Sequence, residues 1–340
     1  MHATTHTPMA AVVPDTDLMR AITQDVYGTS DAWQLATIPK PAIGDDEVLI
    51  RVHAAGLDRG TWHTMTGRPY LMRIMGFGFR RPKNPVPGLA TAGTVVDVGR
   101  DVTRFAVGDD VYGVSRGAFA EYAAAPEDKL AHMPSNLTFE QAAAVPVSGT
   151  TALQAVRKGR LEAGQTVLVI GASGGVGIYA VKLAKAFGAE VTGVCSTTKT
   201  DLVRSIGADH VIDYLTDDVT DGSTRYDLIL DIGGNTPLPR LRRALARTGT
   251  LVLVGGESKG NLTGGFGRSL RAPVWSLVLR QRLTMLSSSE RSPSLEELTE
   301  LIDAGTITPA ISCVHPLEQA RAAMELMESG QARGKIVIAV

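Results

Sequence analysis

The sequence predicts an α/β protein in which a compact β-rich domain precedes a doubly wound parallel sheet. Two observations carry this prediction. From Leu18 to about Val145 the chain consists of short β-branched runs separated by glycine and proline, a pattern typical of small β domains. From about Val147 onwards, continuous apolar runs alternate with amphipathic stretches, which indicates βαβ units with both faces of the sheet covered.

In the β-rich part, three segments are the clearest strand candidates. Glu47–Ala54 alternates between apolar and polar residues, as a half-buried strand does. Gly93–Val98 and Asp110–Val114 are further short strands with turn residues between them. Repeated short strands of this kind predict a partly open barrel.

The parallel part begins with a continuous apolar strand, Gln165–Ile170, followed by a glycine turn and a helix. Val176, Ala180, Leu183 and Phe187 form the buried stripe of that helix. Further strands are expected at Glu190–Val194, His210–Ile212, Leu228–Asp231 and Leu251–Val254, and further helices at Lys199–Ile206 and Pro239–Ala246.

The last part of the chain breaks the rhythm of the parallel sheet. Helices are expected at Ser294–Ala304 and Leu317–Glu328, and a final strand at Lys335–Val340. This tail could return to the β-rich domain or form a small cap.

The composition is compatible with two domains and excludes several function classes. The chain has 340 residues, of which 44% are hydrophobic, enough to bury a sizeable core. Its 34 basic and 35 acidic residues leave a net charge of −1, so neither nucleic acid nor an anionic membrane is an expected partner. Cys195 and Cys313 lie far apart and outside any CxxC pair, which excludes a disulfide framework and a cysteine-built zinc site.

The chain carries no membrane or secretion signal. Residues 1–17 lack a basic start and a long apolar stretch, so we expect a flexible tail there. The most apolar segment elsewhere, Pro273–Leu279, is far shorter than the roughly 20 residues that a membrane span needs. We therefore expect a cytoplasmic protein with no membrane partner.

The glycine turn is the first functional motif. It runs Gly171-Ala-Ser-Gly174-Gly175-Val-Gly177, directly after a strand and at the start of a helix. Glycines allow the backbone to approach a pyrophosphate, and the helix N-terminus offers free N–H groups and a positive dipole end. We therefore predict that Ser173, Gly174, Gly175 and Val176 bind a dinucleotide; a purely structural turn is the alternative.

The end of the second parallel strand predicts which dinucleotide binds. After Cys195 come Ser196, two threonines and Lys199, and no carboxylate occurs before Asp201. A carboxylate here normally takes the ribose hydroxyls of NAD. Small hydroxyls and a lysine favour a 2′-phosphate instead, so Ser196 and Lys199 predict NADPH. Alternatively, Lys199 only begins a solvated helix.

Several motifs in a fixed order then carry a family resemblance. They are GDDEVLIRVHAAGLDRG, NPVPGLATAGTVVDVG, VGDDVYG, GAFAEYAAAP, VSGTTALQA, GASGGVG and GADHVIDY. With these motifs, residues 18–340 resemble the medium-chain dehydrogenase/reductase superfamily, and within it the zinc-free branch of NADPH:quinone oxidoreductases and enoyl or alkenal reductases.

The resemblance implies a GroES-like β-barrel domain, residues 18–146 and 287–340, and a Rossmann domain that binds NADPH, residues 147–286. The active site is then expected in the cleft between the two domains. A homodimer is also implied, formed through the strand at about Arg282–Ser288; an internal strand with a covered edge is the alternative.

Departures from the zinc-dependent relatives are informative. The positions of their three catalytic zinc ligands correspond here to Asp58, Leu89 and Pro146, and the lobe with four cysteines is missing between Gly113 and Phe119. A single carboxylate does not supply the three protein ligands of a catalytic zinc. The sequence therefore predicts no zinc.

Catalytic candidates lie in one segment. Asp58 could position the substrate or donate a proton, or only cap a turn. His63 occupies the position of a relay histidine and titrates near neutrality, although it could merely pack at a domain edge. Gly60 interrupts the relay, and Thr61 might replace the missing hydroxyl.

Further cofactor contacts follow from the resemblance or from the sheet edge. Thr150 matches a threonine beside the nicotinamide, and Tyr214 matches a tyrosine near the adenosine phosphate. Gly233 and Gly255 follow successive strands at the carboxyl edge, where ligands bind in such folds. Each of these residues could also have a purely structural role.

Two segments rich in methionine, phenylalanine, arginine or tryptophan are expected to shape the substrate site: residues 70–84 and residues 264–275. The predicted pocket residues are Trp62, Tyr70, Phe77 and Phe266. Aromatic side chains separated by glycines would suit a flat apolar substrate under a mobile lid, and a basic surface loop is the alternative.

The leading functional hypothesis is an NADPH-dependent, zinc-free reductase of an activated C=C bond, in an enone, enal or polyene, or of a quinone, including roles in natural-product tailoring. A metal-free carbonyl reductase or alcohol dehydrogenase that uses His63 is an alternative. A non-catalytic NADPH-binding protein is another.

Overall fold

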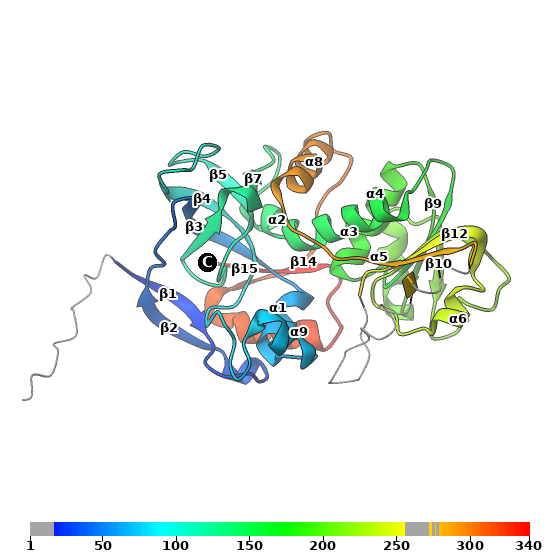
Figure 1. The fold of residues 1–340 in the computed structure, drawn as a ribbon, viewed down its shortest axis with the longest axis horizontal. Helices are drawn as coiled ribbons and strands as arrows, with labels where there is room; N and C mark the ends of the chain where they lie inside the picture. The colour runs from blue at the N-terminus through cyan, green and yellow to red at the C-terminus, as the bar shows by residue number, and fades with distance from the viewer. Residues whose placement is uncertain (1–16, 256–271, 274–275, 277–278) are drawn as a thin grey trace, which may run out of the picture.

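The computed structural model describes residues 17–255, 272–273, 276 and 279–340. Two β-sheets lie toward opposite ends of the molecule, with helices between and around them (Figure 1). This arrangement confirms the predicted α/β fold with a GroES-like domain and a Rossmann-like parallel sheet. The predicted tail, residues 1–17, lies almost entirely outside the described residues.

The first sheet has seven strands among the described residues: six follow one another in the order β14-β15-β3-β4-β5-β7, and the seventh, β6, pairs with β3. Its strands are β3 (Glu47–Leu57), β4 (Ala90–Val98), β5 (Asp110–Val114), β6 (Tyr122–Pro126), β7 (Leu130–His132), β14 (Ile311–Pro316) and β15 (Lys335–Ala339). A separate hairpin consists of β1 (Leu18–Thr23) and β2 (Gln34–Pro39). Strand β3 continues three residues beyond the predicted Ala54, because β15 and β4 pair with it as far as Leu57 and Gly56.

The C-terminal tail returns to this first sheet. Strand β15 pairs antiparallel with β3, placing Ile336 opposite Leu57, and β14 pairs with the outer side of β15. The helices of the tail are α8 (Ser292–Asp303) and α9 (Ala320–Glu328). Of the two alternatives that the sequence left open, the tail therefore joins the β-rich domain and does not form a separate cap.

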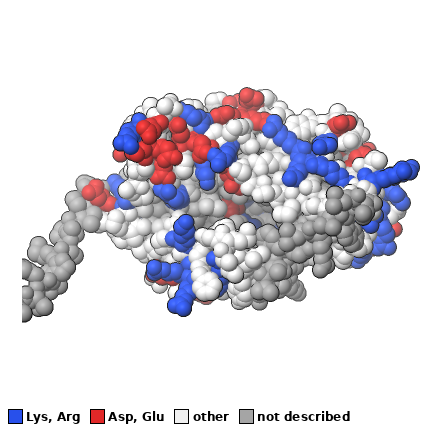
Figure 2. All heavy atoms as spheres, in the orientation of Figure 1, with Lys and Arg blue, Asp and Glu red and all other residues white. Residues whose placement is uncertain are grey.

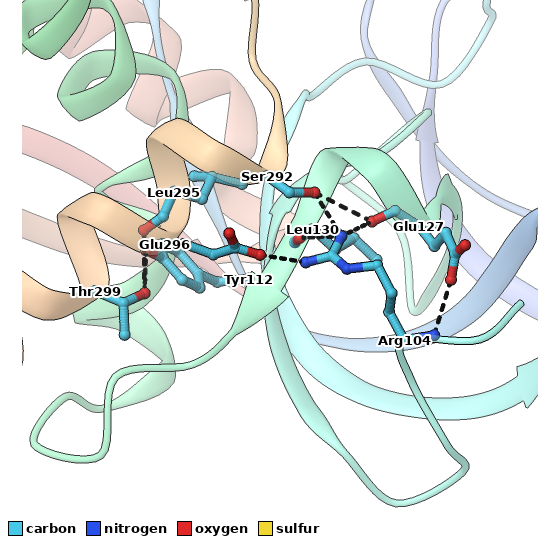
Figure 3. A network of polar contacts seen from close by, with 8 residues as sticks. All are labelled: Arg104, Tyr112, Glu127, Leu130, Ser292, Leu295, Glu296 and Thr299. Atoms are coloured by element: carbon cyan, nitrogen blue, oxygen red, sulfur yellow. Dashed lines mark hydrogen bonds and ion pairs between the residues drawn. The ribbon is translucent and has the colours of Figure 1, made fainter.

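A polar network fixes α8 against the first domain (Figure 3). The guanidinium of Arg104 donates to the Ser292 hydroxyl at 2.6 Å and to Glu296 at 2.5 Å. The buried Tyr112 hydroxyl donates to the Leu295 carbonyl at 2.7 Å. These contacts join segments about 190 residues apart in the sequence and hold the start of the tail in place.

The second sheet has six strands among the described residues, all parallel, in the order β10-β9-β8-β11-β12-β13. Its strands are β8 (Thr166–Ile170), β9 (Glu190–Cys195), β10 (His210–Asp213), β11 (Tyr226–Asp231), β12 (Leu245–Leu253) and β13 (Arg282–Met285). The helices are α4 (Gly175–Ala186), α5 (Thr200–Ser205) and the short α6 (Leu238–Leu241). This is the predicted doubly wound arrangement.

One predicted helix is wrong in extent. The expected helix at Pro239–Ala246 ends at Leu241, and β12 already begins at Leu245. Leu245 pairs with Tyr226 of β11, so pairing with this neighbouring strand outweighs the helical pattern at the start of β12.

One continuous core joins the two domains. Helix α3 (Pro146–Gly159) begins with a proline and buries Leu153 and Val156. The same apolar cluster includes Tyr112 and Val337 from the first sheet and Leu230 from the second. The two sheets are therefore held together by packing around α3, and the cleft beside this helix has firm walls. Helices α1 (Arg59–Thr66) and α2 (Phe139–Ala143) complete the first domain.

The surface agrees with the balanced composition. On the face drawn in Figure 2, patches of basic and of acidic side chains lie near one another, and neither sign covers the face. Among the helices that the structure describes, none is long and apolar enough to cross a membrane.

Candidate active site

The glycine turn between β8 and α4 has a geometry that only glycine permits. Gly171 has a φ of +87°, in the left-handed region. A Cβ atom at Gly177 would lie 2.1 Å from the Gly171 carbonyl oxygen, so any side chain there would break the turn. Ser173, Gly174 and Gly175 lie between these two glycines, and Val176 is in the first turn of α4. The N-terminus of α4 is thus open to an anion, as predicted for a pyrophosphate.

A groove of about 610 Å³ continues from this turn along the carboxyl ends of the parallel strands. Gly171, Val194, Tyr214 and Gly233 line it, so two of the predicted cofactor residues, Tyr214 and Gly233, share one cavity. Its place at the sheet edge and its size suit the adenosine half of a dinucleotide. Gly255 lies outside the lining and donates its amide to the Asp231 carbonyl at 3.3 Å.

The basic residues after β9 are engaged with the returning tail. The Lys199 amine donates to the carbonyls of Gly330 and Ala332 at 2.7 and 2.8 Å. Burial lowers the pKa of Lys199, and the neighbouring guanidinium of Arg333 lowers it further. Arg333 donates to the Thr198 carbonyl at 2.8 Å, next to the predicted ribose contact Ser196. Lys199 therefore ties two domains together, a role that neither sequence interpretation anticipated, and Arg333 is a second cation at this position.

Asp58 combines a structural role with a free carboxylate oxygen. One oxygen, Oδ1, caps α1 by accepting from the Thr61 amide at 2.9 Å, and the Thr61 hydroxyl lies 3.4 Å away. The other, Oδ2, is buried and has no hydrogen-bond partner among the described residues. The alternative role of Asp58 as a cap thus accounts for Oδ1 only. Oδ2 has no partner in the described structure and could accept a hydrogen bond from a ligand.

Lys335 is a buried cation that sequence reasoning missed. It is 3% exposed at the start of β15, and its amine donates to the Leu57 carbonyl at 2.8 Å. Burial lowers its pKa, while the negative charge of Asp58 opposes that lowering. A Cβ atom at Gly175 would lie 3.0 Å from Cδ and 4.0 Å from Nζ of this lysine. Lys335 therefore lies between the Asp58 carboxylate and the N-terminus of α4. Its only sequence signal is a lysine between Gly334 and an apolar run.

The three predicted catalytic residues do not assemble into one relay. His63 has its Nδ1 2.7 Å from the Arg68 carbonyl oxygen, so this nitrogen donates outside the Asp58–Thr61 contact. Thr61 and His63 are two positions apart on α1, and a helix turns about 100° per residue, so they point to opposite sides. The structure thus brings Asp58 and Thr61 together and leaves His63 apart from them.

Thr150 is fully buried in α3, and its hydroxyl has no hydrogen-bond partner among the described residues. Nearby on the same helix, the Ser148 hydroxyl lies 3.1 Å from where a Cβ atom at Gly175 would be. The first turns of α3 therefore face the glycine turn, where the resemblance implies a nicotinamide contact for Thr150.

A second cavity, of about 660 Å³, lies in the first domain. Phe77, Leu89, Val114 and Tyr122 are among its apolar lining. A Cβ atom at Gly60 would lie 2.9 Å from Asp58 Oδ1 and 3.7 Å from the Leu89 side chain. Leu89 lines the cavity, whereas the Asp58 carboxylate lies behind it and is not part of the lining.

Ser115 is a further site residue without a sequence signal. It lines this cavity, its backbone amide donates to the Leu89 carbonyl at 2.9 Å, and its buried hydroxyl has no partner among the described residues. A hydroxyl held unpaired beside an apolar cavity is a ready hydrogen-bond partner for a ligand.

Only some of the predicted substrate residues line the cavity. Phe77 lines the cavity, whereas Trp62 and Tyr70 do not. The Trp62 indole donates to Glu328 of α9 at 2.7 Å, and Tyr70 is 40% exposed at the surface. The interpretation of these two as pocket residues needs correction, because one binds the tail and the other faces solvent. Phe266 and nearly all of the segment 264–275 lie outside the described residues.

The segment 70–84 is tethered at its middle. The Tyr27 hydroxyl donates to the Gly78 carbonyl at 2.6 Å, and the Arg73 guanidinium lies over the Tyr27 ring at 4.2 Å. Phe77 therefore reaches the cavity from a segment anchored to the N-terminal hairpin region, rather than from the mobile lid that its composition suggested.

The donor set at the zinc position does not fit zinc. Asp58 and Leu89 adjoin one another, and Pro146 begins α3. Within the described parts of the chain, no group of three histidine, cysteine, aspartate or glutamate side chains could hold a metal ion. One carboxylate beside a leucine and a lysine lacks the ligands of a catalytic zinc.

Comparisons with known proteins agree with this architecture. A family model described as alcohol dehydrogenase GroES-like domain matches residues 44–135, and one described as zinc-binding dehydrogenase matches residues 206–338. The chloroplastic quinone-oxidoreductase QR1 of Triphysaria versicolor is 31% identical over 94% of this chain and 98% of its own. The mitochondrial NAD(P)H oxidoreductase RTN4IP1 of Bos taurus is 33% identical over 96% and 90%.

Further relatives extend the comparison. The 2-methylene-furan-3-one reductase of Solanum lycopersicum is 30% identical over 94% of this chain and 79% of its own. The solved structure of the quinone oxidoreductase from Coxiella burnetii superposes with a TM-score of 0.83 at 28% identity, covering 95% of this chain and 99% of that one. Sequence and fold agree on one assignment: this chain belongs to the quinone oxidoreductase-like branch of the medium-chain dehydrogenase/reductase superfamily.

Proposed function

We propose that this protein is a zinc-independent, NADPH-dependent reductase that transfers hydride to the activated C=C bond of an enone, enal or polyene, or to a quinone. The observation that carries the proposal is the continuity of the site. Gly175 of the glycine turn neighbours Lys335, Lys335 interacts electrostatically with Asp58, and Gly60 lies close to both Asp58 and Leu89 of the apolar cavity. We infer from this chain of neighbours that cofactor and substrate meet beside Asp58 and Leu89. The relatives named as quinone oxidoreductases and as a furanone reductase support the same chemistry.

The residues of the chain have distinct roles in this proposal. The N–H groups at the start of α4 bind the pyrophosphate, and Thr150 lies beside the nicotinamide. A bound nicotinamide would supply the hydride. The Ser115 hydroxyl donates to the substrate oxygen as negative charge develops there, and the apolar cavity excludes water and strengthens that bond. The Lys335–Asp58 pair holds the proton that completes the reduction.

The preference for NADPH rests on the end of β9. No carboxylate is present between Val194 and Asp201, while Lys199 and Arg333 bring two cations to this place, one bonded to tail carbonyls and the other paired with Asp201 at 2.6 Å. A 2′-phosphate accepts from such donors, whereas ribose hydroxyls alone do not need them. The test is the ratio of kcat/KM for NADPH and NADH. Similar values for the two cofactors would refute the preference.

Independence from zinc is proposed because the donor set at Asp58 lacks the ligands, not because metal is missing. We expect purified protein to keep its turnover after dialysis against a chelator, and added zinc to leave the rate unchanged. Loss of activity on chelation with recovery on zinc addition would overturn this part of the proposal.

Product analysis tests the reaction itself. With an enone and NADPH, we expect a product two mass units heavier in which the carbonyl is intact. An allylic alcohol would instead favour the carbonyl reductase alternative. Binding of NADPH without oxidation across a broad panel of enones and quinones would favour the non-catalytic alternative.

A homodimer is proposed through β13. This strand is the outermost of the six, and no further strand covers its outer edge among the described residues. A second copy could extend the sheet there. A monomeric mass by light scattering at micromolar concentration would rule this out.

A further inference from the structure

The substrate cavity carries charge of one sign. Its charged lining residues are Lys83, Arg116 and Lys129, here named the cationic wall, and no aspartate or glutamate lines it within the described chain. The rest of the lining is apolar or neutral. Positive charge is therefore concentrated against an otherwise apolar surface, where electrostatic interactions are less screened than in open water.

Two of these cations lack a counter-charge. Lys129 is half-buried and Lys83 is exposed, and neither amine makes an ion pair or hydrogen bond with the residues that the structure describes. Arg116 differs, because its guanidinium lies 2.8 Å from the buried carboxylate of Glu47. Glu47 also accepts from the Gly44 amide at 2.9 Å, so this carboxylate is fully engaged. Two positive charges of the wall remain uncompensated.

The wall lies beside the hydroxyl that is proposed to bind the substrate oxygen. Arg116 directly follows Ser115, and both residues line the cavity. Lys129 lines it too, and the next residue, Leu130, pairs with Gly113 at the end of β5 that precedes Ser115. A molecule in the cavity can therefore contact Ser115 and the wall together.

We propose that the substrate is an apolar molecule with an anionic group, a carboxylate or a phosphate, that contacts the cationic wall while the oxygen of its reducible group accepts from Ser115. The inference rests on the proposed reductase function and adds the substrate class. A volume of about 660 Å³ falls within the range of small-molecule sites, so an elongated substrate of moderate size fits. An incoming anion would compensate the half-buried ammonium of Lys129, which is otherwise left unpaired.

The experiment compares three substrates with the same enone and the same apolar chain. One ends in a carboxylate, one in its methyl ester and one in a phosphate. Steady-state kinetics with NADPH are measured for the wild-type protein and for Lys129→Met, Lys129→Arg and Lys158→Met. Lys158 is the matched control, because it is also a half-buried lysine but lies at the end of α3, outside this cavity.

For the wild type we expect kcat/KM to be about tenfold higher for an anionic substrate than for the ester, equivalent to about 1.4 kcal/mol. Lys129→Met should remove most of that preference through KM and leave the ester within twofold. Lys129→Arg and Lys158→Met should keep it. Higher salt should weaken the preference, because part of the wall is exposed. Comparison of carboxylate with phosphate identifies the favoured anion.

The failures are distinguishable. If the ester is reduced as well as both anionic substrates, or if Lys129→Met lowers all three rates equally, the reductase stands and the anionic substrate class is wrong. If none of the three is reduced with NADPH or NADH while the cofactor binds, the reductase function itself is wrong, and the substrate class falls with it. Circular dichroism and cofactor binding confirm that each variant is folded.

Discussion

The buried pair of Lys335 and Asp58 gives the sharpest test of the site. Lys335→Met keeps the length of the side chain and its packing at the domain junction but removes the positive charge. The Asp58 carboxyl group, 5% exposed, then lacks the nearby cation. We expect Lys335→Met to be strongly destabilising, and Asp58→Asn less so, because Lys335 still donates to the Leu57 carbonyl.

The magnitude follows from burial. Removing one partner of a direct buried salt bridge costs about 3–5 kcal/mol. Lys335 and Asp58 interact only electrostatically, and Asp58 keeps two hydrogen bonds from Thr61, so we take about 2 kcal/mol. For a protein of this size, about 2 kcal/mol lowers the midpoint of thermal unfolding by about 3 °C. The double variant, with methionine at 335 and asparagine at 58, buries no charge at this point. It should recover at least about 1 kcal/mol relative to the sum of the two single variants.

The pH dependence supplies an independent readout. Burial lowers the pKa of Lys335 in the folded state below its ordinary 10.5. Between the lowered pKa of the folded state and the ordinary pKa of 10.5, the unfolded chain binds more protons than the folded protein. The contribution of Lys335 to the free energy of unfolding therefore rises as the pH increases toward 10.5. In the Lys335→Met variant, this increase of stability with pH should be absent.

The assay is thermal unfolding of the four proteins between pH 7 and pH 10, with NADPH affinity measured in parallel. Additive effects of the two substitutions would refute the reasoning, since independent residues show no coupling. An unchanged pH slope in Lys335→Met would refute it separately.

Three further predictions concern other parts of the fold. Gly177→Ala places a Cβ atom 2.1 Å from a backbone oxygen and should weaken NADPH binding by at least tenfold in a fluorescence titration, whereas Gly28→Ala, with 3.4 Å of space, should not. Burial lowers the pKa of His53 below 6.5, and Arg51 adds to this, so stability falls as the pH drops below 6.5; His53→Gln should flatten that fall in acid unfolding curves. Arg104→Ala should raise hydrogen exchange in α8 and cost about 2 kcal/mol, and unchanged exchange would argue against the network of Figure 3.

The parts of the fold that follow local patterns could be predicted from the sequence. The strand before Gly171 is a continuous apolar run, and the glycine turn after it fixes where α4 begins. The start of β12 could not be predicted, because its first residues have a helical pattern and Leu245 becomes part of the strand through pairing with Tyr226 of β11. Propensity is local, whereas the pairing partners of β12 are distant along the chain.

Site residues could be predicted from the sequence where the family resemblance supplied their positions. They could not be predicted where the burial of a side chain determines its role. Asp58 stood out because it replaces a zinc ligand. Lys335 did not, because a lysine at the start of a strand is usually exposed, and this one is buried only through pairing with β3, 278 residues away. The sequence placed His63 and Thr61 in one candidate relay, but the geometry of α1 turns the two side chains to opposite sides.

In the proposed zinc-independent reductase, Asp58 stands where the resemblance puts a zinc ligand and Lys335 lies near it, and this difference has a chemical consequence. A zinc ion would polarise a substrate oxygen directly. Here positive charge comes from the Lys335 ammonium, whose hydrogen bond to the Leu57 carbonyl fixes it beside Asp58 and the N-terminus of α4. An ammonium and a hydroxyl such as Ser115 can stabilise an enolate or a reduced quinone oxygen, but they polarise an unactivated carbonyl far less than a metal does. In the proposed reductase, the same residues that make zinc unsuitable would favour conjugate reduction over alcohol oxidation, and the anionic substrate inferred from Lys129 would add a contact with the cationic wall.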